Sequence, residues 1–259
     1  MNTPSQSKWL ALTTFVCACF TFSATAADFD QAFDVKAGGQ LELKTESGSI
    51  QVRTHKAATV LVEVDIKGRD AEDFEVTAEL SGNTVSVNGE VDGRGWNRKL
   101  QVEFLVTVPK EFNVDLDTAG GSIKVSDLNG DLMAHTSGGS IRIGAVRGKV
   151  ELNTSGGSIQ TEEIYGSLNA HTSGGSIRAT FAEQLQEDAV LDTSGGSIVA
   201  YLLPESKIDL DASTSGGRVK TDFKVNGRIK KQSIRGEING GGPELRLRTS
   251  GGSVTIREL

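Results

Sequence analysis

The chain has 259 residues, 31 of which are glycine, and a formal net charge of −7. This acidic balance argues against a nucleic-acid partner, because nucleic-acid-binding domains present basic patches. Both cysteines, Cys17 and Cys19, lie close to the amino terminus, so disulfides and thiolate metal sites are excluded from the rest of the chain.

Residues 1–26 predict a secretory signal peptide. The single charge of Lys8 precedes an apolar run from Trp9 to about Phe22, and the small residues at 24–26 fit an A-x-A cleavage site. The run is shorter than the roughly 20 residues of a membrane span, and we expect no transmembrane segment in the mature chain. Lipid attachment at Cys19 is the alternative. The sequence therefore predicts an exported protein that is periplasmic, on the cell surface or extracellular.

Residues 27–112 predict an N-terminal β region that is mostly antiparallel. It contains "LELKTESGSIQVRT" at 41–54, which looks like a distant copy of a unit repeated later in the chain. Alternating apolar and polar residues then predict four longer strands, separated by turn residues. These strands cover residues 59–66, 73–80, 84–89 and 100–109. No linker follows them, so we expect the region to continue directly into the next one.

Residues 113–259 repeat one motif. "TSGGSI" occurs at 136–141, 154–159, 172–177 and 193–198, and near-copies begin at 118, 214 and 249. Successive Gly-Gly pairs are 18, 18, 18, 21, 21 and 35 residues apart. A fixed period of this kind indicates a solenoid, in which each unit buries its core against its neighbours. The sequence thus predicts an all-β protein with a β-solenoid of about 18-residue coils.

Alignment of the units on Gly-Gly shows which positions face inward. The position four residues before the pair alternates between leucine and alanine, and the position three residues after its first glycine is isoleucine or valine. Period-2 alternation predicts short strands with one buried face, so TSGG forms a corner between two strands. We expect at least one glycine of a corner pair to need a positive φ. The predicted corner glycines are Gly120, Gly121, Gly138, Gly139, Gly156, Gly157, Gly174, Gly175, Gly195, Gly196, Gly216, Gly217, Gly251 and Gly252.

Two segments depart from the repeat. "FAEQLQEDAV" at 181–190 is the one short helical candidate. "RLRTSGGSVTIREL" at 246–259 is expected to end the stack with an exposed strand. Free backbone groups of such a strand invite pairing with another chain, and the charges of Arg257 and Glu258 discourage it. We therefore expect a monomer in dilute solution.

The order of these features resembles a family of bacterial secreted β-strand-repeat proteins known as adhesin-like, with a domain of unknown function. The resemblance rests on "LELKTESGSIQVR", "VTVPKEFNVDLDTAGGSIKV" at 106–125, the repeated TSGGSI, and "GEINGGGPELRLRTSGGSVTI" at 236–256. It covers almost the whole chain after the signal peptide. It implies the fold, and adhesion as a label. The family offers no catalytic residues to transfer.

One outward column of the repeat is basic. Directly after the inward isoleucine or valine stand Lys124, Arg142, Arg178 and Lys220, interrupted by uncharged residues. Like charges stacked along a sheet repel one another, so this basic stripe is the candidate binding site for an anionic surface polysaccharide. A solvated face without a partner is the alternative.

Other side chains predict no catalytic, metal or cofactor site. His135 and His171 are two coils apart, roughly 9–10 Å, which is too far for one zinc ion. Gly-Gly is followed by Ser-Ile, without the aspartate that calcium-binding repeats need. The candidate carboxylates of a polysaccharide-cleaving enzyme are scattered over several columns. They are Asp117, Asp127, Asp131, Glu151, Glu162 and Glu163.

These observations favour a non-catalytic, exported binding or adhesion-like module of the cell envelope. Its expected partner is an anionic surface polysaccharide or an envelope protein. A self-associating structural envelope protein is the alternative, and a polysaccharide-active β-helix enzyme is a further one.

Overall fold

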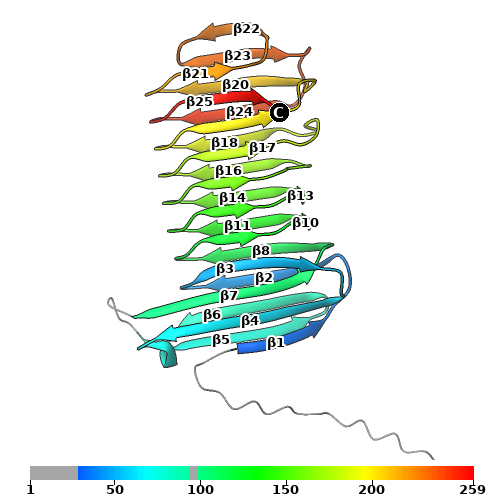
Figure 1. Ribbon diagram of the computed structural model, residues 1–259, viewed down its shortest axis with the longest axis vertical. Coiled ribbons are helices and arrows are strands. Elements are labelled where there is room, and N and C mark those ends of the chain that lie inside the picture. Colours follow the sequence, from blue (N-terminus) through cyan, green and yellow to red (C-terminus); the bar gives the residue numbers. More distant parts are fainter. Residues whose placement is uncertain (1–28, 94–98) are drawn as a thin grey trace, which may run out of the picture.

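The computed structural model describes residues 29–93 and 99–259 (Figure 1). Within these ranges the chain is all-β, and its one helical element is the short 3-10 turn η1 (Ala71–Asp73). The strands form two large mixed sheets of eleven and twelve strands and a third sheet of two strands. The predicted signal peptide at 1–26, with Cys19, lies outside the described residues.

The eleven-stranded sheet, sheet A, contains in spatial order β1 (Phe29–Asp34), β4 (Thr59–Gly68), β7 (Leu100–Pro109), β3 (Ser49–His55), β9 (Ile123–Val125), β12 (Ile141–Ile143), β15 (Ile159–Thr161), β17 (Ile177–Thr180), β19 (Ile198–Leu202), β25 (Val254–Glu258) and β21 (Val219–Thr221).

The twelve-stranded sheet, sheet B, contains β22 (Val225–Lys230), β23 (Ser233–Ile238), β20 (Ile208–Thr214), β24 (Glu244–Thr249), β18 (Ala189–Thr193), β16 (Leu168–Thr172), β14 (Val150–Thr154), β11 (Leu132–Thr136), β8 (Phe112–Thr118), β2 (Gly39–Thr45), β6 (Thr84–Val91) and β5 (Phe74–Ser81). The third sheet pairs β10 (Leu128–Asn129) with β13 (Val146–Arg147).

The repeated units stack as rungs, each made of one sheet B strand, a TSGG-type corner and one sheet A strand (Figure 1). In the regular part, neighbouring rungs pair in parallel between residues 18 positions apart, so Ile141 pairs with both Ile123 and Ile159. The inner faces of the two sheets supply one continuous apolar core. Alternation along each strand therefore leaves every second side chain on an outer face.

Threonine and serine hydroxyls join each corner to the previous one. The Thr154 hydroxyl donates a hydrogen bond to the Gly139 carbonyl oxygen at 2.7 Å and accepts one from the Gly157 amide at 3.3 Å. Beside it, the Ser158 amide donates to the Ser140 hydroxyl at 3.1 Å. Thr154 is almost fully buried, and its hydroxyl finds its hydrogen-bond partners in the backbone of the two stacked corners.

The corner glycines differ from the expectation of a positive φ. Of the seven pairs, Gly121 alone takes a positive φ, 119°. At the other pairs glycine is required because the rungs stack closely and leave no room for a side chain at the second position. A Cβ on Gly139 or Gly157 would overlap the carbonyl group of the second glycine in the preceding rung, whereas a Cβ on Gly138 would meet no atom within 4 Å. The two glycines of a pair are therefore not equivalent.

The N-terminal region is more mixed than predicted. Among its strands the pairs β1–β4, β4–β7 and β5–β6 are antiparallel, but β2–β6 and β3–β7 are parallel. β2 and β3 flank a corner at Gly48 and pair in parallel with β8 and β9 of the first regular rung. These two strands therefore behave as a rung, which makes both sheets continuous across residue 112.

The predicted helix at 181–190 is wrong. Phe181 instead forms a parallel bridge with Ile164, and β18 begins at Ala189. Phe181 and Leu185 are buried in the core. The side chain of Gln184 holds the connecting loop by donating to the Lys207 carbonyl oxygen at 2.8 Å. Inward packing and strand pairing therefore override the local helical preference.

The expectation that residues 246–259 end the stack is also wrong. β24 lies between β18 and β20, and β25 lies between β19 and β21 (Figure 1). The Thr249 hydroxyl donates to the Gly196 carbonyl oxygen, and the Thr214 hydroxyl donates to that of Gly252, both at 2.6 Å. β25 is therefore not an edge strand, and only its last residues, Arg257 and Glu258, pair with β19 alone. The free edges at this end are β22 in sheet B and β21 in sheet A.

Candidate binding surfaces

The basic stripe lies on the outer face of sheet A, and all four of its residues are exposed. Pairing registers place Lys124 beside Arg142, and Gln160 separates Arg142 from Arg178. The inserted C-terminal rung moves Lys220 away, because both Val199 and Thr255 stand between it and Arg178. The structure thus brings three of the predicted cations together and leaves Lys220 roughly 14 Å from the nearest one, at about 4.8 Å per strand.

The stripe cations are largely uncompensated. None of the four takes part in an ion pair within 4.0 Å among the residues that the structure describes. Arg178 donates one hydrogen bond, 3.4 Å long, to the Tyr201 hydroxyl. Lys124 and Arg142 line a shallow hollow together with Asp127 and Glu162. The hollow is therefore mixed in charge.

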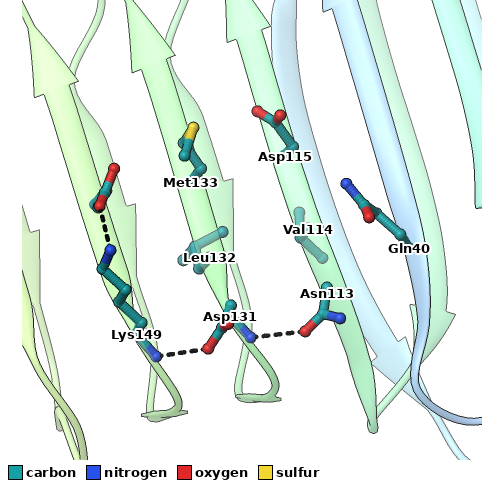
Figure 2. A pocket seen from close by; sticks show the side chains of 9 residues that line it. Gln40, Asn113, Val114, Asp115, Asp131, Leu132, Met133 and Lys149 are labelled. Carbon is teal, nitrogen blue, oxygen red and sulfur yellow. Dashed lines mark hydrogen bonds and ion pairs between the residues drawn. The ribbon is translucent and has the colours of Figure 1, made fainter.

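A second hollow, of about 310 Å³, lies on the outer face of sheet B (Figure 2). Two of its polar side chains, Asn113 and Asp131, join neighbouring rungs. The Lys149 amide donates to Asp131 Oδ1 at 2.8 Å, and the Asp131 amide donates to Asn113 Oδ1 at 2.9 Å. Lys149 Nζ lies 2.8 Å from Glu151 Oε1. These groups already have protein partners, so they hold the rungs together and are not free to bind a ligand.

On this face, the surroundings of Asp115 disfavour the charged form of its carboxyl group. Its partial burial raises the pKa of its carboxyl group above the usual value of 3.8, and the nearby Glu42 and Asp117 raise it further against the opposing charge of Lys44. Its ladder partner on one side, Met133, is 48% exposed and offers no hydrogen bond to the carboxylate.

We expect Asp115→Asn to raise the free energy of unfolding at pH 7 but not at pH 3. Because the pKa is higher in the folded state, the folded chain holds the proton more tightly, and stability falls as the pH rises through this pKa. Asparagine removes the charge that causes this loss. Urea unfolding at the two pH values tests it. An asparagine variant that is less stable than the parent at pH 7 would show that attraction to Lys44 dominates instead.

The two histidines do not meet. Asn153 separates His135 from His171 in the ladder, as the sequence predicted. His171 Nδ1 lies 4.0 Å from Asp192 Oδ1, and both side chains are exposed. Among the described residues, no three His, Cys, Asp or Glu side chains are grouped so that they could hold a metal ion. Of the candidate carboxylates, Asp131 and Glu151 both line the hollow on sheet B. Asp127 and Glu162 both line the hollow beside the basic stripe.

Sequence reasoning missed the free edge at β22. Residues 224–235 contain five basic residues and no acidic one, in a chain that is acidic overall. β22 and the turn after it are exposed and cap the end of sheet B (Figure 1). The run of charge and the 35-residue spacing before the last Gly-Gly pair were signals of a separate element here.

Comparison with known families decides the classification. A model of the Toastrack DUF4097 family matches residues 67–257. This chain belongs to the Toastrack DUF4097 family. The resemblance seen in the sequence is thereby confirmed, and the Toastrack DUF4097 domain is one of unknown function. No protein among the curated proteins matches the chain.

Several solved structures are similar over nearly the whole chain. A "putative adhesin" from Bacteroides fragilis is 16% identical with a TM-score of 0.44, and the match covers 91% of this chain and 98% of that one. A "putative lipid binding protein" from Parabacteroides distasonis is 15% identical with a TM-score of 0.43, covering 90% and 96%. A "putative cell adhesion protein" from Clostridium sporogenes is 11% identical with a TM-score of 0.40, covering 91% and 100%.

In the described part of this Toastrack DUF4097 chain, no helix has the length and apolar character of a membrane span.

Proposed function

We propose that this protein is an exported, non-catalytic binding module of the cell envelope. Its ligand is an extended anionic polymer, of which an acidic surface polysaccharide is the model case. The polymer lies along the axis of an 18-residue β-solenoid, across the outer face of sheet A. The periplasm and the outer cell surface both satisfy this proposal.

The alignment of Lys124, Arg142 and Arg178 in one ladder supports the proposal. Parallel strands in register repeat a side chain about every 4.8 Å, so a linear polymer meets several cations at once. Each exposed charge pair contributes little alone, and simultaneous contacts add by multivalency. Asp127 and Glu162 beside the stripe oppose an anion, so we expect modest affinity.

Titration of an acidic polysaccharide onto the protein tests the proposal. We expect binding at low salt that weakens as salt rises, because exposed charges are screened beyond about 8 Å at physiological ionic strength. A variant with all four stripe residues changed to serine (Lys124→Ser, Arg142→Ser, Arg178→Ser and Lys220→Ser) should lose it.

A matched control removes the same charge elsewhere. Four exposed loop lysines are changed to serine: Lys36→Ser, Lys56→Ser, Lys110→Ser and Lys207→Ser. This control should bind like the parent. Equal loss of binding in both variants would show that binding depends on net charge and not on the position of the stripe. The absence of binding by the parent at low salt would overturn the proposal.

A further inference from the structure

Sheet B ends in a free strand on each side of the molecule. β5 pairs with β6 alone and β22 pairs with β23 alone in the part of the chain that the structure describes. The two strands lie at opposite ends of the long axis (Figure 1). A free edge strand presents unpaired N–H and C=O groups that can pair with another strand.

Each of these edges exposes a large apolar side chain. Four large hydrophobic residues are exposed among the described residues, and two of them are Leu80 of β5 and Ile229 of β22. Leu80 is 39% exposed and Ile229 is 61% exposed. Leu80 pairs with the buried Val85 and Ile229 pairs with the buried Ile234, so both lie on the inner, core-facing side of sheet B. The apolar core thus reaches solvent at both ends.

The two edges carry opposite charge. Residues 74–92 contain four acidic residues and no basic one, whereas residues 224–235 contain five basic residues and no acidic one. On the outer face, Glu75 stands directly opposite Glu90, and Arg228 stands directly opposite Arg235. Like charges directly opposite each other are destabilising in a sheet. An oppositely charged strand added at either edge would relieve this repulsion.

Strand directions also match. β22 runs parallel to the stacked strands of sheet B, because it is antiparallel to β23 and β23 is antiparallel to β20. β5 runs against the stack, because it is antiparallel to β6 and β6 is parallel to β2. A second copy placed end to end along the axis would therefore bring its β5 against β22 as an antiparallel pair. The inner faces would coincide, with Leu80 on the same side as Ile229.

We infer that β22 of one copy pairs with β5 of the next, so that the protein assembles head to tail with sheet B continuous across copies. The contact joins two different surfaces, so it is heterologous and propagates as an open chain rather than closing as a dimer. Main-chain hydrogen bonds supply the pairing, and the charges of Glu79 and Arg228 select the partner edge. This inference is independent of the basic stripe on sheet A.

Charge reversal at each edge tests the inference by sedimentation velocity over a concentration series. The parent should form species of increasing size as concentration rises and salt falls. Glu75→Lys/Glu79→Lys makes the strands β5 and β22 both basic, and Arg228→Glu/Lys230→Glu makes both strands acidic, because these are the only charged residues of the two strands. Each variant alone should show an association constant at least about tenfold lower, because like charges then face each other. An equimolar mixture of the two should associate again, with the copies alternating.

Controls separate this effect from net charge and from misfolding. Glu162→Lys/Glu187→Lys and Lys56→Glu/Lys110→Glu make the same charge changes at exposed positions in the loops and should assemble like the parent. Ile229→Ser changes no charge and should weaken assembly. Far-UV circular dichroism checks that each variant is folded. A parent that stays monomeric at low salt, or a mixture of the two folded edge variants that does not associate, would overturn the inference.

Discussion

Replacing Gly157 with alanine is expected to destabilise the protein by about 1–3 kcal/mol or more, the cost of inserting atoms into a filled space. The new Cβ would overlap the carbonyl group of Gly139 and approach the Ser140 Cα to 2.6 Å. These are backbone atoms of the neighbouring rung, so the overlap cannot be relieved by the rotation of a side chain. The only relief is to separate the rungs, which strains the Thr154 and Ser158 hydrogen bonds at the same corner.

Gly138→Ala is the matched comparison, because a Cβ there meets no atom within 4 Å and its φ is not positive. We expect its unfolding free energy to stay within about 0.5 kcal/mol of the parent. Urea unfolding followed by circular dichroism measures both. Equal effects of the two substitutions would mean that the stacking of the second glycines does not determine the corner.

Much of the fold could be predicted because alternation in the sequence reports directly which face of a strand is buried. The predicted strand at 59–66 lies within β4 (Thr59–Gly68), and the one at 100–109 coincides with β7 (Leu100–Pro109). The Gly-Gly spacing likewise gave the register that places Lys124 beside Arg142. Such features depend on residues within one strand or on the next repeated unit along the chain.

The order of the last rungs could not be predicted, because the rungs are chemically interchangeable. Thr249, Gly252 and Ser253 carry the same corner groups as any other unit, so this rung fits between two others as well as it fits at the end. The alternation of leucine and alanine breaks there, since Leu191 pairs with Leu247. The misplaced Lys220 follows from the same insertion.

The free edges at β22 and β5 could not be predicted from the sequence for a related reason. Whether a strand is an edge depends on which strands pair with it, and no local pattern in β22 or β5 reports that. The charge of each segment could be read, but its opposition to the other end of the molecule required the topology.

Truncating Leu152 to alanine is expected to cost about 2–5 kcal/mol, the range for large-to-small changes in a core. Leu152 is fully buried, and its ladder partners are Ala134 and Ala170. The variant therefore places three alanines in succession, and the small neighbours cannot fill the cavity. Met133→Ala, on the exposed face of the same sheet, should stay within about 0.5 kcal/mol.

The leucine–alanine alternation makes a stronger test possible. Ala170→Leu alone should cost about 1–3 kcal/mol by overpacking against Leu152 and Leu191. In the double variant Leu152→Ala/Ala170→Leu, the leucine moves by one rung and partly fills the space that Leu152 leaves. Its destabilisation should be smaller than the sum of the two single effects, because residues that share a cavity couple. A double-mutant cycle from urea unfolding measures the coupling. Strict additivity would show that the two side chains do not share the same packing space, and the size alternation would then have no role in holding the rungs together.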